Sequence, residues 1–119
     1  MENNSLNTIK RSSEFLTVKK LGQRNWPTKW LLFNYMQNQE GHLRFGITAS
    51  RKTGIAVVRN KLKRWVRDYI RGLPSSDQSL AFDINFIFKP MEVGFYKGLD
   101  HGEFKKAMDR GFATLRKIR

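Results

Sequence analysis

Between residues 55 and 71, hydrophobic side chains recur every three or four positions, which is the spacing of one face of an α-helix. A helix advances about 100° per residue, and so these side chains share an arc of roughly 140°, wide enough to pack on a sheet. The neighbouring arc is polar and mostly basic. The apolar arc consists of Val58, Leu62, Trp65, Val66, Tyr69 and Ile70, and the polar arc of Arg59, Asn60, Lys63, Arg64, Arg67 and Arg71.

Two further segments predict amphipathic helices. In SSEFLTVKKLG, Ser12 or Ser13 can cap the first turn, and the helix stops at Gly22. A longer helix begins near Asp100, where Asp100 and Glu103 have the spacing of a capping box. The side chains expected on the core face are Phe15, Val18 and Leu21 in the first helix, and Phe104, Ala107, Met108, Gly111, Phe112 and Leu115 in the last.

Three segments have the composition or the alternation of β-strands. The aromatic and apolar run at residues 29–37 predicts one strand, and residues 42–50 alternate between apolar and more polar positions. Residues 38–41 between them are compatible with a hairpin. Residues 82–89 predict a buried strand, and residues 72–81 before it are rich in Gly, Pro and Ser, which is typical of a loop.

The predicted elements follow the order αββαβα, with a turn or a short extra strand at Trp26-Pro27, and describe an α+β fold of helices on one small sheet. The 119 residues, 39% of them hydrophobic, suffice for a single domain with one core. We expect residues 1–8, which are polar, to be a flexible N-terminus, and residues 9–119 to form the domain.

Composition restricts the partners and the compartment. The net charge of +13 favours nucleic acid or an anionic membrane surface as a partner. The absence of cysteine excludes disulfides and thiolate metal sites and fits a reducing compartment. No apolar run reaches the roughly 18 residues of a membrane span, and the N-terminus lacks the apolar core of a signal peptide. We therefore expect a cytoplasmic protein that does not associate with membranes.

The basic arc is unusual because residues 51–71 carry eight of the 23 Lys and Arg but a single acid, Asp68. Like charges four residues apart weaken an isolated helix by about 0.2–0.5 kcal/mol per pair. A face that only keeps a helix solvated usually mixes Glu with Lys, whose pairing adds stability. The pattern therefore favours phosphate binding over a merely solvated face.

The stretch RFGITASRKTG followed by AVVRNKLKRWVRDYIR resembles the signature of the bacterial ribonuclease P protein family. In that family a strand ends in Gly-hydrophobic-x-x-Ser-basic-Lys, and the next helix opens with Ala-Val-x-Arg-Asn-x-x-Lys-Arg. The resemblance extends over residues 9–116. The matching residues are Gly46, Ile47, Ser50, Arg51, Lys52, Ala56, Val57, Arg59, Asn60, Lys63, Arg64 and Arg67.

The resemblance implies an αβββαβα sandwich similar to a ribosomal-protein fold. It also implies a left-handed crossover between the strand before the basic helix and the strand after it. Chain geometry alone favours the opposite hand, since about 98% of parallel βαβ connections are right-handed. On this point we follow the resemblance.

The resemblance further implies that an RNA subunit with bound Mg²⁺ hydrolyses precursor tRNA, while the protein binds this ribonuclease P RNA and the 5′ leader of the substrate. No catalytic or metal-ligating residue and no required protein partner are then expected. Basic side chains would neutralise phosphates, whereas Asn60 could instead hold the first turn of the helix. The residues expected to bind the catalytic RNA are Ser50, Arg51, Lys52, Arg59, Asn60, Lys61, Lys63, Arg64 and Arg67.

The leader site in this family is a cleft between the first helix and the sheet, lined by aromatic side chains. The corresponding positions are Phe15, Lys19, Lys29, Trp30 and Phe33. Bases of single-stranded RNA commonly stack on aromatic rings above a charged groove, and core packing is the alternative for each aromatic. Lys19 stands where the family often has a second aromatic, so charge is expected to replace stacking there.

Three other functions are considered. A ribosomal-type RNA-binding protein would share the fold, whereas a DNA-binding helix would need a turn-helix partner and a dimer that nothing in the sequence suggests. A nuclease acting alone would need His42 and His101 near one phosphate, but neither has an evident acid–base partner. The acids do not form a metal-binding cluster, because they are scattered over loops and element ends: Asp77, Asp83, Glu92, Asp100 and Glu103.

Overall fold

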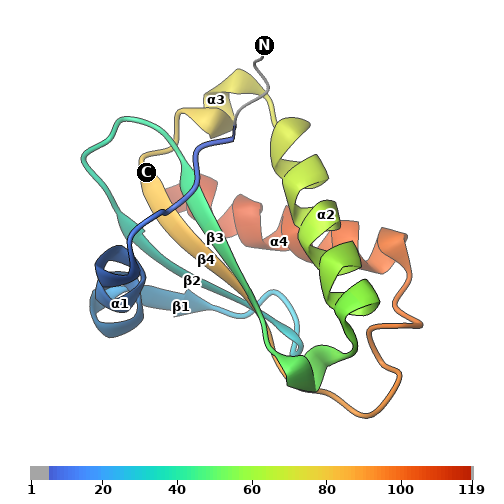
Figure 1. Cartoon of the computed structure of the whole chain (residues 1–119). Helices are drawn as coiled ribbons and strands as arrows, with labels where there is room; N and C mark the ends of the chain where they lie inside the picture. The colour runs from blue at the N-terminus through green and yellow to red at the C-terminus, as the bar shows by residue number, and fades with distance from the viewer. Residues whose placement is uncertain (1–5, 119) are drawn as a thin grey trace.

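A mixed four-stranded sheet separates one short helix from two long helices (Figure 1). The computed structural model describes residues 6–118. The α+β class and the order of the predicted elements are confirmed, and a short helix is added within the stretch predicted as a loop. The elements are α1 (Ser12–Leu21), β1 (Gln23–Asn25), β2 (Leu31–Gln37), β3 (Arg44–Ala49), the 3₁₀ turn η1 (Arg51–Thr53), α2 (Ala56–Arg71), α3 (Ser75–Gln78), β4 (Phe82–Phe88) and α4 (His101–Ile118).

The strand order is β1-β2-β4-β3, and only β3 and β4 are parallel. The prediction of a hairpin between β2 and β3 is therefore wrong, because β4 lies between them. β2 and β4 are almost continuously buried, which is typical of central strands covered on both faces. These two strands form the core of the sheet, and β3 is left at its edge.

The N-terminal segment covers part of the free edge of β3. The Ile9 N–H donates to the Phe45 carbonyl at 2.8 Å, and the Phe45 N–H donates to the Asn7 carbonyl at 3.1 Å. Asn7 thus belongs to the edge of the sheet, although it falls within the stretch predicted to be flexible. Residues 1–5 of that stretch lie outside the described residues.

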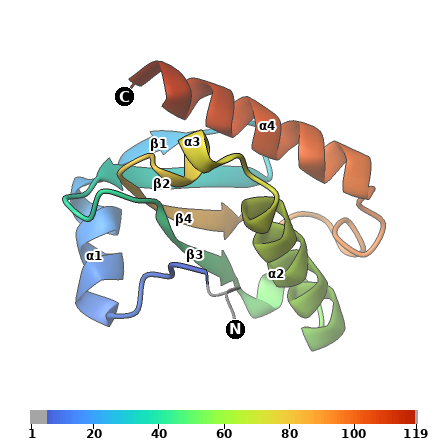
Figure 2. The same ribbon diagram turned by 90° about the horizontal axis from the view of Figure 1, so that it is seen from above.

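The connection from β3 through α2 to β4 joins two parallel neighbouring strands. Both strands run downward in Figure 1, so they recede from the viewer in Figure 2, which is seen from above. In the second view the chain passes anticlockwise from β3 to α2 and on to β4. A path that turns anticlockwise as it recedes is left-handed, so the crossover has the hand that the resemblance implied, against the general preference.

α2 and α4 cover one face of the sheet, and α1 covers the other (Figure 2). All six residues predicted for the core face of α4 are buried. One of them, Gly111, lets α4 approach β2 closely, since a Cβ atom there would lie 2.3 Å from the Phe33 ring. On α2, Val58, Leu62, Val66 and Ile70 are buried, and Trp65 and Tyr69 are partly buried against the same core.

The start of α1 differs from the prediction, because Arg11 and not Ser12 or Ser13 occupies the N-cap position. The Arg11 N–H donates to Glu14 Oε1 at 3.3 Å, and this carboxylate reaching back over the first turn takes the place of a serine cap. Leu21, predicted for the core face, is 71% exposed at the end of the helix.

Candidate RNA-binding surface

The basic arc of α2 faces away from the sheet, because the buried residues at about every fourth position seat the opposite side of the helix on it. Within residues 6–118, the only ion pair on this helix joins Arg71 to Asp68 at its C-terminal end. The other cations of the arc therefore have no carboxylate partner among these residues. Asn60, Arg64 and Arg67 are exposed, and Arg59 and Lys63 are partly buried at its margin.

Ser50, Arg51 and Lys52 form the entry to α2, and all three are exposed. The Thr53 hydroxyl donates to the Ser50 carbonyl at 2.6 Å and closes the turn η1. The N-cap residue is Ile55, whose hydrocarbon side chain cannot accept a hydrogen bond. No side chain caps the first N–H groups of α2, which lie beside two cations at the positive end of the helix dipole, a setting that favours an anion.

Lys61 lies apart from the other cations of α2. Its Nζ donates to the carbonyls of Tyr96 and Lys97 at 2.8 and 3.3 Å, and it lies 4.8 Å from the centre of the Trp65 ring. These contacts fasten the loop before α4 to α2. Lys61, which the sequence analysis included among the residues expected to bind the catalytic RNA, therefore has local partners within the protein.

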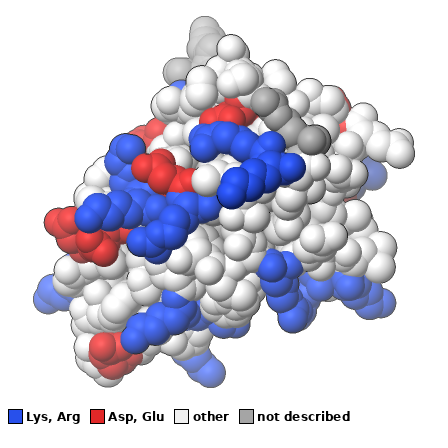
Figure 3. All heavy atoms as spheres, turned by 180° about the vertical axis from the view of Figure 1, so that it is seen from behind, with Lys and Arg blue, Asp and Glu red and all other residues white. Residues whose placement is uncertain are grey.

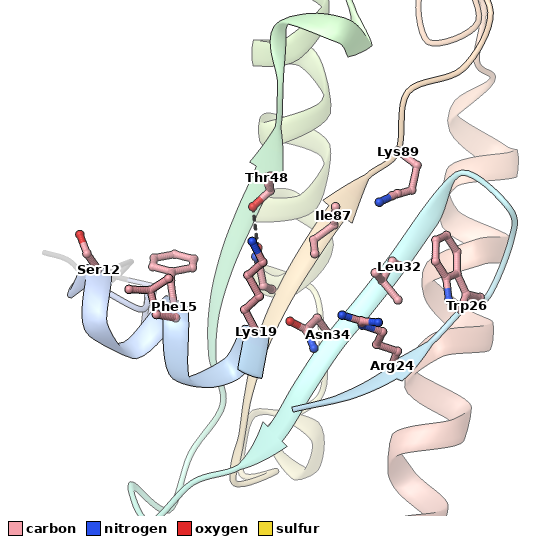
Figure 4. A pocket seen from close by; sticks show the side chains of 12 residues that line it. Ser12, Phe15, Lys19, Arg24, Trp26, Leu32, Asn34, Thr48, Ile87 and Lys89 are labelled. Atoms are coloured by element: carbon pink, nitrogen blue, oxygen red, sulfur yellow. Dashed lines mark hydrogen bonds between the residues drawn. The ribbon is translucent and has the colours of Figure 1, made fainter. Parts of the chain in front are cut away.

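A groove of about 810 Å³ lies between α1 and the sheet (Figure 4). Phe15 and Lys19, which were predicted for the leader site, project into it from α1. β1, β2, β3 and β4 all contribute to its floor. The lining residues are Ser12, Phe15, Leu16, Lys19, Arg24, Trp26, Leu32, Asn34, Thr48, Asn85, Ile87 and Lys89.

Phe33 and Trp30 do not line this groove, so the prediction that they lie in the cleft between the first helix and the sheet is wrong. Phe33 is fully buried and packs edge-on against Phe86 and Phe112, at 4.8 and 5.6 Å between ring centres. Trp30 is 7% exposed and stacks on Phe88 at 6.5 Å. Alternate residues of a strand point to opposite faces, and Phe33 points toward α4. Trp30 lies just before β2 and packs against Phe95 and Tyr96 in the loop before α4.

The same alternation turns Leu32 and Asn34 toward the groove, where the prediction had placed Phe33. Lys29 is exposed before β2 and does not line the groove. The strand named in the prediction does line the groove, but Phe33 lies on its other face.

Several groove residues were missed by sequence reasoning. In β4 and the residue after it, Asp83, Asn85, Ile87 and Lys89 occupy the positions that alternate with the phenylalanines and Ile84, and three of these four residues are polar. Asn85, Ile87 and Lys89 line the groove. This alternation was a signal that the strand has one more polar face. Asn85 is oriented by Thr48, whose hydroxyl donates to its Oδ1 at 3.1 Å. Arg24 and Trp26 gave no such signal, because β1 is only three residues long.

Acidic side chains near the groove are neutralised by Arg44. Its guanidinium donates to both oxygens of Asp83, at 2.9 and 2.7 Å, and to Glu14 at 3.1 Å. The Arg11 backbone N–H, and then Arg44, hold the pKa of Glu14 below its ordinary value. No acid occurs among the lining residues that the structure describes, and the cations there are Lys19, Arg24 and Lys89.

The groove and the basic arc meet at Phe15. A second hollow of about 270 Å³ lies on the β3 edge, and Phe15, Gly46, Lys63 and Arg67 are among its lining residues. Phe15 borders both hollows, and it can lie on β3 because Gly46 has no side chain: a Cβ atom there would be 2.3 Å from the ring. The two hollows thus share Phe15, and each of them is also lined by cations.

The two histidines are on separate elements. His42 precedes β3, with Nδ1 3.2 Å from the Leu43 carbonyl oxygen. His101 begins α4 and packs against Trp65 at 4.9 Å between ring centres. Among residues 6–118, no group of three or more His, Asp or Glu side chains is placed to hold a metal ion. No helix in the described part of the chain is long and apolar enough to cross a membrane.

A basic helix beside a groove on a mixed sheet defines a small α+β nucleic-acid-binding protein. Comparison with known families narrows this class to one family: the model of the Ribonuclease P family matches residues 4–116. The chain therefore belongs to the ribonuclease P protein family. Its role is that of a protein subunit of the endoribonuclease that processes the 5′ end of tRNA, with RNA as its partner.

Individual relatives agree with this assignment. The chain is 32% identical over 113 residues to the ribonuclease P protein component of Fusobacterium nucleatum, which covers 95% of this chain and 100% of that protein. It is 30% identical over 113 residues to the component of Bacillus cereus, with 92% and 95% covered.

Solved structures agree on the fold. The ribonuclease P protein of Thermotoga maritima superposes with a TM-score of 0.75 at 26% identity, covering 95% of this chain and 98% of that one. The protein of Staphylococcus aureus gives 0.74 at 26% identity, with 96% and 95% covered.

Proposed function

We propose that this chain binds the catalytic RNA of ribonuclease P through η1 and the basic arc of α2, and holds the 5′ leader of precursor tRNA in the groove between α1 and the sheet. The observation that carries the proposal is the continuity of the two surfaces at Phe15, which borders both the groove and the hollow beside Lys63 and Arg67. An RNA strand leaving the groove would pass directly onto the basic arc.

Such a surface would act by lowering the repulsion between two RNAs. Cations held between two polyanions release condensed counterions from both, and binding of this kind weakens steeply with salt. The groove would add stacking on Phe15 and contacts of Lys19 and Arg24 with phosphates, which suits a single strand whose bases are unpaired. Contact with the leader would extend substrate recognition beyond the tRNA body.

Hydrolysis is assigned in this proposal to the RNA subunit, together with the Mg²⁺ ions that it binds. The protein then needs neither a catalytic residue nor a metal ligand of its own, and no further protein partner. Location in the cytoplasm, where precursor tRNA is processed in bacteria, belongs to the same proposal.

The experiment is cleavage of a precursor tRNA with a 5′ extension by bacterial ribonuclease P RNA at low Mg²⁺, with and without this protein. We expect cleavage only when both components are present, because the protein replaces part of the charge screening that Mg²⁺ otherwise supplies. Protein alone is the control. Cleavage by the protein alone would overturn the proposal, and so would a lack of rescue by protein that still binds the RNA.

A further inference from the structure

Trp26 is a large aromatic side chain left half in solvent. It is 48% exposed and lines the groove at the end away from Phe15 (Figure 4). The other two tryptophans are in different settings, since Trp30 is 7% exposed and Trp65 packs on Phe104 of α4. An indole ring that is open on one face above a basic groove is suited to stack on an unpaired base.

The loop that carries Trp26 is fixed in place. Arg110 of α4 donates to the Pro27 carbonyl at 2.9 Å, and the Trp30 N–H donates to the Thr28 hydroxyl at 3.2 Å. A ring held on such a loop loses little freedom when a ligand stacks on it, and a preorganised group of this kind contributes more to affinity than a mobile one.

A cation lies at the face of the ring. Lys89 Nζ is 5.8 Å from the centre of the Trp26 ring, and Arg24 lines the same end of the groove. A base that stacks on Trp26 would bring its phosphate within reach of these side chains. The far end of the groove thus has the same two components as the near end, where Phe15 is accompanied by Lys19.

We propose that Trp26 is a second stacking platform for the leader, so that the groove holds a single RNA strand at both ends. In this arrangement Trp26 supplies, from the opposite wall, the second aromatic that Lys19 does not provide on α1. The inference rests on the proposed function and deepens it, because it sets how far along the leader the protein makes contact.

The test measures binding of precursor tRNAs with leaders of increasing length to the holoenzyme, assembled from ribonuclease P RNA and this protein. Trp26→Ala is expected to lower affinity about fivefold or more, the loss of one stacked base, but only for leaders long enough to reach Trp26. Trp26→Phe should retain most of the affinity. Leu21→Ala is the control, because Leu21 is 71% exposed and lies outside the groove lining. An equal loss at every leader length would overturn the inference, since it would indicate a structural role.

Phe15→Ala distinguishes failure of the second platform at Trp26 from failure of the groove as the leader site. If Phe15→Ala abolishes the dependence on leader length and Trp26→Ala does not alter it, the second platform is wrong and the groove is still the leader site. If neither variant alters it, the groove itself is wrong. Tryptophan fluorescence gives an independent reading: a leader oligonucleotide should quench the emission of the holoenzyme, and Trp26→Phe should remove most of that change.

Discussion

α2 and α4 pack against each other on one face of the sheet, and both bury an apolar stripe, yet their outer faces differ. Seen from behind, Lys and Arg lie beside Asp and Glu over α4 (Figure 3). Two ion pairs span that helix, Lys105 with Asp109 at 3.3 Å and Lys106 with Glu103 at 3.4 Å. The outer face of α2 has one acid, Asp68, at its C-terminal end.

The difference indicates two roles: α4 completes the fold, whereas the outer face of α2 is suited to an anionic partner. Opposite charges at helical spacing stabilise α4 slightly and require nothing outside the protein. Repeated like charges on α2 cost stability, and an external anion would offset that cost. The core faces of the two helices look alike, so the composition of the outer faces is what assigns the proposed RNA-binding role to α2 and not to α4.

The largest expected effect comes from removing two charges from each helix in turn. Lys63→Ala with Arg64→Ala should weaken binding to ribonuclease P RNA on the order of 50-fold near 0.1 M salt, because each lost phosphate contact lowers the salt slope by about 0.9. Lys105→Ala with Lys106→Ala removes the same charge from α4 and should change affinity less than about threefold. Filter-binding titrations at several salt concentrations measure both, and equal losses would contradict the comparison.

Gly111→Ala tests the structural role of α4. A Cβ atom at this position would lie 2.3 Å from the buried Phe33 ring, so we expect a loss of about 1–3 kcal/mol in the free energy of unfolding from overpacking. Affinity of the folded protein for RNA should be unchanged. The control is Gly98→Ala, where the nearest atom is at an ordinary 3.6 Å. Urea denaturation followed by circular dichroism gives both values, and equal stability of the two variants would show that α4 is not closely packed.

The smallest effect should distinguish two lysines on α2. Lys61→Ala removes the hydrogen bonds to the carbonyls of Tyr96 and Lys97 and should lower the free energy of unfolding by about 1 kcal/mol, without altering the salt slope of RNA binding. Lys63→Ala should do the reverse. A reduced salt slope for Lys61→Ala would contradict this prediction and show that Lys61 does contact RNA.

The sequence predicted the core face of α4 correctly because a helix buried on one side alternates between apolar and polar positions with a clear period. It failed at β2, where Phe33 was assigned to the groove. That strand is covered on both faces, so its residues are almost all apolar and carry no signal of which face each one takes. β4 keeps polar residues on the groove side, and its pattern did contain the missing information.

The order of the strands could not be predicted from the sequence for a related reason. Local spacing at residues 38–41 permits a hairpin, but pairing is decided by which strands can be buried on both faces, and β4 meets that requirement better than the edge strand β3. The place of Trp26 was hidden as well, because a three-residue strand has too few positions to show an alternation.

The position of β4 between β2 and β3 also governs when the basic helix can be seated during synthesis. β3 and α2 leave the ribosome before residues 82–88, which supply the one strand neighbour that β3 has along its whole length. Until that strand is made, α2 has no finished sheet beneath it, and its contacts must form across a long stretch of chain, which slows folding. An RNA that contacts the growing chain early would therefore encounter the basic side chains of α2 before the helix is packed on the finished sheet.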